Sequence, residues 1–135
     1  MSTKARIILF PKISDIRGDL AIVENTDIPF NVRRVYYLYN VPTGSTRGGH
    51  AHKNLQQIII ALSGSFRVTV NDGAEESTFC LRDPQQGLYL ERLVWRELDE
   101  FSQGAVCMVL ASDEYSENDY IRDRTDFFRA IKAEE

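Results

Sequence analysis

Short segments of apolar or alternating residues run from about Ile7 to Leu110, and turn residues separate them. This spacing is typical of an all-β sandwich or barrel. Gly, Pro, Asn and Asp mark the breaks, and the run Asn71-Asp72-Gly73 is the strongest hairpin turn. The pattern predicts strands over residues 5–10, 19–24, 33–39, 50–53, 57–63, 65–70, 76–81, 87–90, 94–98 and 105–111.

Two of these segments, residues 58–60 and 106–111, are apolar at consecutive positions. A strand of this kind is covered on both faces, so either a second sheet or a second subunit must supply the cover. We therefore consider a homodimer, in which sheets pack across a two-fold axis, as a hypothesis.

The tail changes character after Ser112. An acidic stretch over residues 113–119 is followed by a segment whose spacing predicts an amphipathic helix closing one end of the β-domain. Its apolar positions are Tyr120, Ile121, Phe127, Phe128 and Ile131. No repeat or linker interrupts the chain, so we expect residues 1–135 to form a single domain.

Composition narrows the class of protein. Of 135 residues 43% are hydrophobic, yet no apolar run approaches the ~20 residues that cross a bilayer, so we expect no membrane partner. Cys80 and Cys107 are isolated in apolar surroundings, which indicates reduced thiols and favours the cytoplasm. The net charge is -4 and acidic residues crowd the last third, which argues against nucleic acid.

The chain contains two histidines, His50 and His52, one residue apart. Residues two apart on a strand point to the same face, so the two imidazoles project together behind the Gly-rich turn at residues 44–49. Two structural histidines would be the ordinary interpretation of such residues. Paired titratable groups on one strand face favour a functional site instead.

The spacing of Gly44, His50-Ala51-His52, Gln57 and Gly64 resembles the first motif of the cupin β-barrels. In that motif two histidines and a glutamate bind a divalent metal, together with a histidine from a second motif. Here Gln57 replaces the glutamate, and residues 87–97 contain Arg96 but no histidine. Two imidazoles beside a guanidinium make a poor divalent site, so we expect a cupin, jelly-roll-like, without metal or other cofactor.

Several further motifs stand along nearly the whole chain. They are Arg34-Val35-Tyr36-Tyr37, the turn from Arg47 to Lys53, Gly87-Leu88-Tyr89, Val94-Trp95-Arg96-Glu97, the run from Val109 to Tyr115, and Asp119-Tyr120-Ile121-Arg122. Together these motifs resemble the dTDP-sugar 3,4-ketoisomerases. That resemblance implies isomerisation of dTDP-4-dehydro-6-deoxyglucose to a dTDP-3-dehydro-6-deoxyhexose through an enediol, on the route to 3-amino sugars of polysaccharides or antibiotics. It also implies a metal-independent dimer.

Without metal, the histidines are free for acid and base work. We predict that His50 is the principal base and that His52 shares or relays the proton, because imidazole titrates near neutral pH. Candidate donors to the developing oxyanion are Arg17, Tyr36 and Arg96.

The diphosphate of such a substrate requires positive charge. Arg47 and Lys53 flank the histidines, although strand alternation turns Lys53 only partly toward them. Arg96 follows Trp95 in an apolar strand, so its burial requires a partner, either Glu97 or the substrate.

Two other functions remain open on the sequence. One is a dTDP-sugar 3,5-epimerase, and the other is a non-catalytic cupin that binds a sugar nucleotide. Within the isomerase interpretation, the gluco or galacto configuration at C4 of the product also stays open, since the sequence does not place the proton donor.

Overall fold

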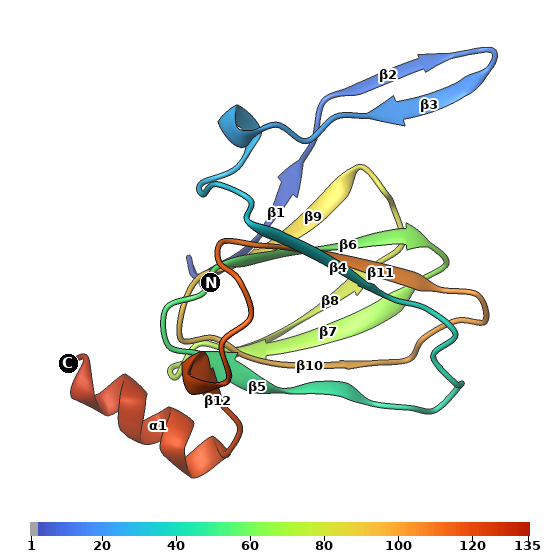
Figure 1. The fold of residues 1–135 in the computed structure, drawn as a ribbon. Helices are drawn as coiled ribbons and strands as arrows, with labels where there is room; N and C mark the ends of the chain where they lie inside the picture. The colour runs from blue at the N-terminus through green and yellow to red at the C-terminus, as the bar shows by residue number, and fades with distance from the viewer. Residues whose placement is uncertain (1–2) are drawn as a thin grey trace.

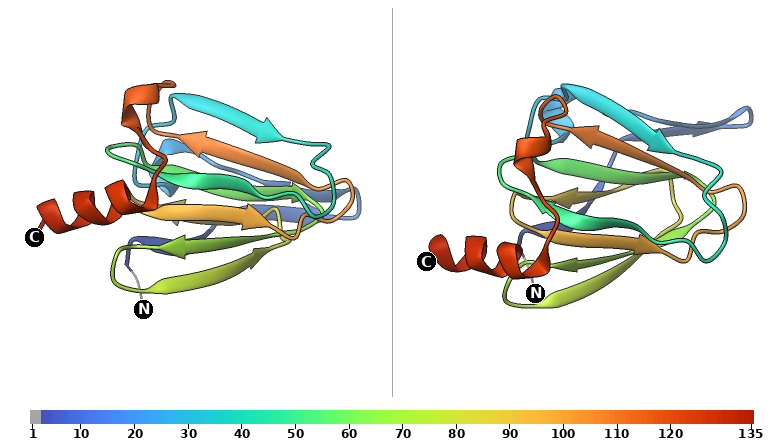
Figure 2. Two further views of the ribbon diagram at one scale, coloured as in Figure 1. Left: turned by 90° about the horizontal axis from the view of Figure 1, so that it is seen from below. Right: turned by 60° about the horizontal axis from the view of Figure 1, so that its bottom comes forward.

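The computed structural model describes residues 3–135, in which two five-stranded antiparallel sheets face each other as the layers of a barrel (Figures 1 and 2). The first sheet contains, in order, β1 (Ala5–Leu9), β9 (Gln86–Leu90), β6 (Gln57–Ser63), β11 (Val106–Ala111) and β4 (Arg34–Leu38). The second contains β12 (Tyr120–Ile121), β5 (Arg47–His52), β10 (Trp95–Asp99), β7 (Phe66–Asn71) and β8 (Glu76–Leu81). Outside them lie the hairpin of β2 (Lys12–Asp15) and β3 (Gly18–Ala21), the 3-10 turns η1 (Asn25–Asp27) and η2 (Glu117–Asp119), and helix α1 (Arg124–Ala133).

The main core lies between the two sheets. Alternate side chains of each strand point inward, among them Ile59 and Leu88 from the first sheet and Val68 and Leu98 from the second. The predicted all-β barrel with a C-terminal helix is therefore confirmed, and nine of the ten predicted strands overlap an observed strand closely.

The outer face of the first sheet is also buried. Ile58, Ile60 and Leu110 point outward and pack against Ile28 and Phe30, which belong to the segment that follows β3. The chain therefore covers both faces of β6 and β11 itself. Burial of these strands gives no argument for a second subunit, contrary to the reasoning from the sequence.

The tail differs from its predicted form. Tyr120 and Ile121 pair with His52 and Ala51 of β5 as strand β12, instead of beginning the helix. Helix α1 starts at Arg124, because the Asp123 carboxylate accepts the backbone N–H of Asp126 and caps it there. Phe127 buries its ring on the outer face of the second sheet, so the helix flanks the barrel.

The β2–β3 hairpin departs most from the predicted pattern. The sequence predicts no strand over residues 12–15, and every residue of both strands is exposed. Among the described residues the two strands pair only with each other, and Figure 1 shows the hairpin projecting from the barrel. A free hairpin has no buried face, so hydrophobic alternation does not reveal it.

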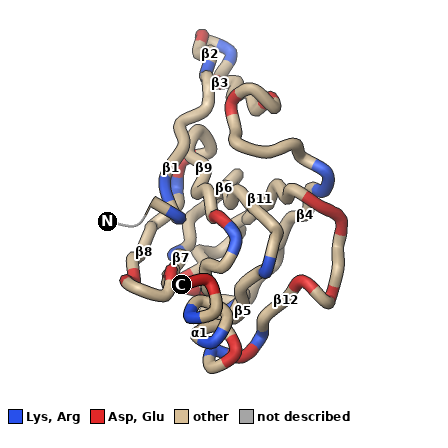
Figure 3. The backbone as a smooth tube through the Cα atoms, turned by 90° about the vertical axis from the view of Figure 1, so that its left-hand side faces the viewer, with Lys and Arg blue, Asp and Glu red and all other residues tan. Residues whose placement is uncertain are grey.

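Across residues 3–135 the structure contains no helix with the length and apolarity needed to cross a membrane. Basic and acidic positions are mixed along the side of the molecule that carries α1 (Figure 3).

Candidate active site

A cavity of about 390 Å³ lies inside the barrel between the two sheets. Four of the predicted site residues, Tyr36, Arg47, His50 and Arg96, line it, and Gln57 joins them from β6. They come from β4, β5, β10 and β6, so the fold brings together residues that are up to 60 positions apart in the chain.

The start of β5 directs His50 into the cavity. Arg96 of β10 pairs with His50, whereas the next residue, Glu97, pairs with Gly48, so Gly49 is an extra residue in a β-bulge. Gly48 and Gly49 both have left-handed backbone angles, with φ of 83° and 74°. A side chain at Gly48 would place its Cβ 3.0 Å from the Arg96 carbonyl oxygen. Glycine therefore permits the tight strand approach that orients His50.

His50 is a neutral imidazole at physiological pH. Burial and then the charge of Arg96 lower the pKa of His50 to about 3, against a partial opposing effect from its hydrogen bond with the Gly48 backbone. That hydrogen bond occupies one ring nitrogen, so the second is free to act as a base.

His52 lies behind His50 and is 1% exposed. Its Nδ1 is 3.1 Å from a carboxylate oxygen of Asp119, and its ring centroid is 4.9 Å from that of His50. The Tyr120 ring packs against both imidazoles, at 4.9 Å from His50 and 4.4 Å from His52. Burial and then Arg96 lower the pKa of His52 to about 2. His52 does not line the cavity, so it can exchange protons there only through a neighbour.

Arg96 is a buried cation with a fixed set of partners. Its guanidinium is 2% exposed, donates to the Gln57 side-chain oxygen, and bonds the Val94 carbonyl at 3.1 and 3.3 Å. Gln57 in turn donates to the Tyr36 hydroxyl at 3.1 Å. Burial lowers the pKa of Arg96 to about 10, which leaves it charged at neutral pH. The alternative partner considered from the sequence, Glu97, is wrong, because its carboxylate bonds Trp95 on the outer face.

The hydrogen bonds of Gln57 and His52 do not fit the metal site of the cupin motif. Gln57, at the glutamate position, already accepts a guanidinium, and Asp119 engages Nδ1 of His52. A cation fixed among the prospective ligands opposes a divalent ion. Within residues 3–135 no group of three or more His, Cys, Asp and Glu has a metal-binding arrangement.

The family model described as FdtA: WxcM-like, C-terminal matches residues 3–132. The TDP-4-oxo-6-deoxy-alpha-D-glucose-3,4-oxoisomerase of Aneurinibacillus thermoaerophilus is 46% identical over 127 residues, covering 93% of this chain and 91% of the relative. The chain belongs to the FdtA family. The resemblance noted in the sequence is thereby confirmed.

Solved structures of 3,4-ketoisomerases share the fold of this FdtA-family chain. A histidine-to-asparagine mutant of QdtA from Thermoanaerobacterium thermosaccharolyticum, in complex with TDP-4-keto-6-deoxyglucose, has a TM-score of 0.95 and 41% identity, over 98% of this chain and 97% of that one. The WlaRB TDP-quinovose 3,4-ketoisomerase from Campylobacter jejuni has a TM-score of 0.91 and 42% identity, over 95% and 99%. The cupin-type barrel is confirmed.

Four cavity residues of this FdtA-family chain escaped selection from the sequence. The Arg34 guanidinium lies 5.1 Å from the Tyr36 ring centroid and 5.7 Å from that of Tyr115, and Arg122 lies 4.2 Å from Tyr120. All four stand within or at the end of the motifs that carry the family resemblance. The last three belong to the tail, where the sequence predicted an acidic stretch and a helix and did not predict the pairing of β12 with β5.

Besides His52, two predicted site residues lie outside the cavity. Arg17, at the hairpin tip, has an 88% exposed side chain and pairs with Asp15 at 2.7 Å. Lys53 follows β5, where its backbone bonds Asp119, and its exposed side chain lies beyond the cavity lining. Lys53 therefore lies apart from the cavity that holds His50, because its position along the chain alternates with that of His52. Arg17 does not meet the cavity within one chain.

Proposed function

We propose that this chain is an isomerase that converts TDP-4-keto-6-deoxyglucose into a TDP-3-keto-6-deoxyhexose without a bound metal. One observation carries the proposal: a neutral imidazole, His50, and a buried guanidinium, Arg96, share one cavity. Imidazole can remove a proton next to a ketone, and a fixed cation can stabilise the oxyanion that results. The substrate follows from the relatives, which are named for this reaction or bind this sugar nucleotide.

The reaction follows from these groups. The free nitrogen of His50 takes the proton from C3, and the electron pair moves onto the C4 oxygen to give an enediolate. The proton of the C3 hydroxyl then passes to the C4 oxygen, a proton returns from the base to C4, and C3 becomes the ketone while C4 carries a hydroxyl. Arg96 and Tyr36 are the donors assigned to the oxyanion, where each donor contributes about 3 kcal/mol to the transition state. His52 relays the proton through His50.

The cavity's cations suit an anionic substrate. Arg34, Arg47 and Arg122 line it together with Arg96, and we assign them to the diphosphate. Arg96 and Arg122 also lower the pKa of both histidines. The negative charge of a bound diphosphate offsets this effect, so the base is strongest when substrate is present.

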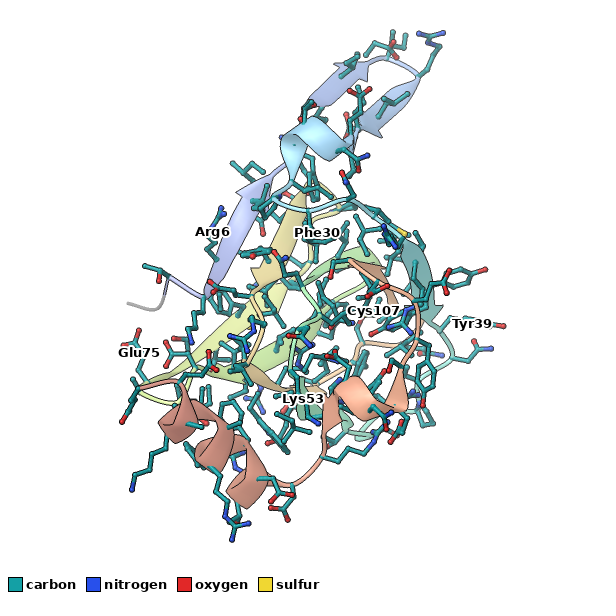
Figure 4. The ribbon with its side chains drawn as sticks, turned by 60° about the vertical axis from the view of Figure 1, so that its left-hand side comes forward. Arg6, Phe30, Tyr39, Lys53, Glu75 and Cys107 are labelled. Atoms are coloured by element: carbon teal, nitrogen blue, oxygen red, sulfur yellow. The ribbon has the colours of Figure 1, made fainter. Side chains whose placement is uncertain are left out.

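We also propose that the enzyme is a homodimer in which the β2–β3 hairpin contacts the second copy. Ile13, Ile16 and Leu20 of the hairpin are 59%, 102% and 55% exposed. Tyr37 on edge strand β4 and Tyr39 just after it are 60% and 61% exposed, and Figure 4 shows the labelled Tyr39 pointing away from the barrel. Apolar side chains exposed on a projecting hairpin favour a protein interface. In such a dimer Arg17 serves the site of the other subunit.

We also propose that residues 1–135 form one cupin domain and that the protein lies in the cytoplasm. The free thiols Cys80 and Cys107 are compatible with a reducing compartment. A 3-keto sugar nucleotide is a substrate for transamination, so the product would supply 3-amino sugars for polysaccharide synthesis.

Proton NMR of the reaction in D2O tests the proposed function. The isomerase exchanges deuterium into C3 of recovered substrate and C4 of product, and the ketone moves to C3. Exchange at C3 and C5 without ketone movement would indicate a 3,5-epimerase. Binding without exchange would indicate a sugar-nucleotide sensor. A parallel reaction in H2O gives the C4 configuration from the proton couplings.

The control for this experiment is the His50→Asn variant, which removes the assigned base and leaves an amide of similar size. We expect its exchange at C3 to fall by about 10²–10⁴-fold while it still binds TDP. A folded variant with turnover near wild type would show that another group is the base.

A further inference from the structure

Asp119 is held against His52 by a set of backbone hydrogen bonds. One carboxylate oxygen accepts the Asn54 N–H at 2.8 Å, and the other accepts the Leu55 N–H at 3.3 Å as well as meeting His52 Nδ1 at 3.1 Å. The Asp119 carbonyl also accepts the Lys53 N–H at 2.9 Å. The carboxylate therefore has one orientation, with a lone pair directed at the imidazole.

This contact determines where the proton of neutral His52 resides. A carboxylate accepts hydrogen bonds and donates none, so Nδ1 must carry the hydrogen. The second nitrogen, Nε2, is then unprotonated. Nε2 is buried and has no hydrogen-bond partner among the described residues, although His52 is 1% exposed. A buried polar atom without a partner is costly, so its presence requires an explanation.

We propose that Asp119 is a positioning residue for the isomerisation, which holds His52 as the Nδ1–H tautomer and so makes Nε2 a proton acceptor. This inference rests on the proposed function. No hydrogen bond joins the two imidazoles in the free protein, so a proton passes from His50 to Nε2 of His52 only once these rings, whose centroids are 4.9 Å apart, turn toward each other. The carboxylate then balances the charge of the resulting imidazolium. The proton returns by the same route, so both side chains end the cycle unchanged.

The strongest competing explanation is structural, because the same carboxylate ties down the chain at Asn54 and Leu55. Asp119→Asn separates the two roles. The amide oxygen can keep the Asn54 bond, while the NH2 group replaces the oxygen that faces His52, donates to Nδ1 and gives up the longer Leu55 bond. The proton of His52 must then move to Nε2, which removes the acceptor and leaves the fold in place. A carboxylate-to-amide change beside a catalytic histidine costs about 10⁴-fold in serine proteases through the wrong tautomer.

Nitrogen NMR of protein labelled with ¹⁵N-histidine tests the tautomer directly. The chain has two histidines, so an untagged sample contains two rings, and His50 is the internal reference. We expect protonated Nδ1 on His52 in the wild type, protonated Nε2 in Asp119→Asn, and an unchanged His50. The kcat of Asp119→Asn should fall about 10²–10⁴-fold, with KM within about threefold.

Ser112→Ala is the matched control. The Ser112 hydroxyl accepts the Gln56 N–H at 2.9 Å, so it supports the same loop without touching a histidine. We expect both rings and kcat to be unchanged within about twofold in this variant. Equal losses of kcat and thermal stability in the two variants, with unchanged tautomers, would establish a structural role and overturn the proposal.

Two further outcomes also overturn it: protonated Nε2 on His52 in the wild type, or full activity in Asp119→Asn after the proton has moved. The wild-type spectrum needs no variant, so an unstable Asp119→Asn protein does not prevent the test. A wild-type protein that binds TDP but does not move the ketone contradicts the proposed function, while the spectrum still reports whether Asp119 fixes the tautomer of His52.

Discussion

The pKa values of His50 and His52 are lower than those of histidines on an open surface. Burial and the Arg96 cation both oppose their protonation, so each imidazole is neutral in the free protein. Arg96 has this effect because its charge is buried and, among residues 3–135, its hydrogen-bond partners are the Gln57 and Val94 oxygens and not a carboxylate. The site is therefore a set of fixed cations around neutral bases, and an anionic substrate completes its charge balance.

Binding of TDP should raise the pKa of His50. An opposite charge within ~4–6 Å moves a pKa by about 1–3, and the diphosphate would partly cancel the effects of Arg96 and Arg122. A titration of the histidine ring protons by NMR, with and without TDP, measures the change. Thymidine, which lacks the phosphates, is the control. An unchanged titration in saturating TDP would place the diphosphate away from His50.

Arg96→Met should separate stability from catalysis. An apolar side chain of similar length removes a buried charge, which is often neutral or stabilising, although Gln57 and Val94 lose a donor. We expect Tm to change little and kcat to fall about 10²–10³-fold, the cost of one oxyanion donor. Arg67→Met is the control, since Arg67 pairs with Asp99 on the surface. A kcat of Arg96→Met within threefold of wild type would remove Arg96 from the mechanism.

At the scale of elements, the bulge at the start of β5 sets the direction of the base. The register shift between Arg96 and Glu97 gives β5 one extra residue, and two successive left-handed glycines carry the strand through it. β12 then pairs with the end of β5 and sets Tyr120 against both imidazoles. The catalytic geometry thus depends on strand pairings on both sides of one short strand.

Gly48→Ala should damage the site more than a comparable change elsewhere. Its Cβ would lie 3.0 Å from the Arg96 carbonyl oxygen and 3.2 Å from Leu98, in a backbone with φ of 83°. Gly44→Ala is the matched control, with φ of 89° and no atom within 4 Å. Each variant bears a left-handed backbone cost of about 1–2 kcal/mol. Beyond this shared loss of stability, we expect Gly48→Ala alone to lose activity, by at least about tenfold. Equal losses of activity in Gly48→Ala and Gly44→Ala would contradict this account of the bulge.

The sequence predicted the strands that bury one or both faces, because hydrophobic alternation records burial. It also predicted the shared face of His50 and His52, since strand alternation holds at that end of β5. It could not predict the bulge, which depends on the register with β10. The partner of Arg96 was missed for the same reason, since Gln57 lies 39 positions away on β6.

The C-terminal tail shows more clearly what local sequence pattern cannot predict. Tyr120 and Ile121 are apolar at positions compatible with a helix, and only their pairing with β5 determines that they form a strand. Once they do, Asp119 and Arg122 lie beside the histidines. Local pattern therefore gave the helix from Arg124 onward and missed the segment that completes the site.

For the whole molecule, the two buried histidines make stability depend on pH. Their pKa values, about 3 and about 2 when folded, lie below the unfolded value of ~6.5. Between these values protons bind the unfolded chain preferentially, so stability falls as pH drops below ~6.5. We expect a loss of about 2 kcal/mol from about pH 7 to about pH 5.5, measured by urea unfolding. A variant carrying both His50→Asn and His52→Asn should show a shallower dependence, and equal slopes would disprove the assignment.

The projecting β2–β3 hairpin pairs with no other strand of the described chain, so a single chain does not explain its apolar side chains. Its exposed apolar side chains are not buried in a single chain, and Arg17 at its tip pairs, within the described part of the chain, with Asp15 alone. A dimer would bury these residues and bring Arg17 to a second cavity. Light scattering should therefore give twice the chain mass of 15.5 kDa for the wild type. Ile16→Glu should weaken the dimer, whereas Leu62→Glu, at an exposed position on β6, should not.

Mixed dimers determine whether Arg17 acts across subunits. Arg17→Ala and His50→Asn each impair activity alone if Arg17 binds substrate. When the two variants are unfolded together and refolded, half of the dimers combine one chain of each kind by random association. In these, the chain with intact His50 faces a partner with intact Arg17, so one complete site forms. We expect about a quarter of wild-type activity, since half of the dimers carry one of two sites. Activity no higher than the mean of the separate variants would show that Arg17 does not reach the partner's site.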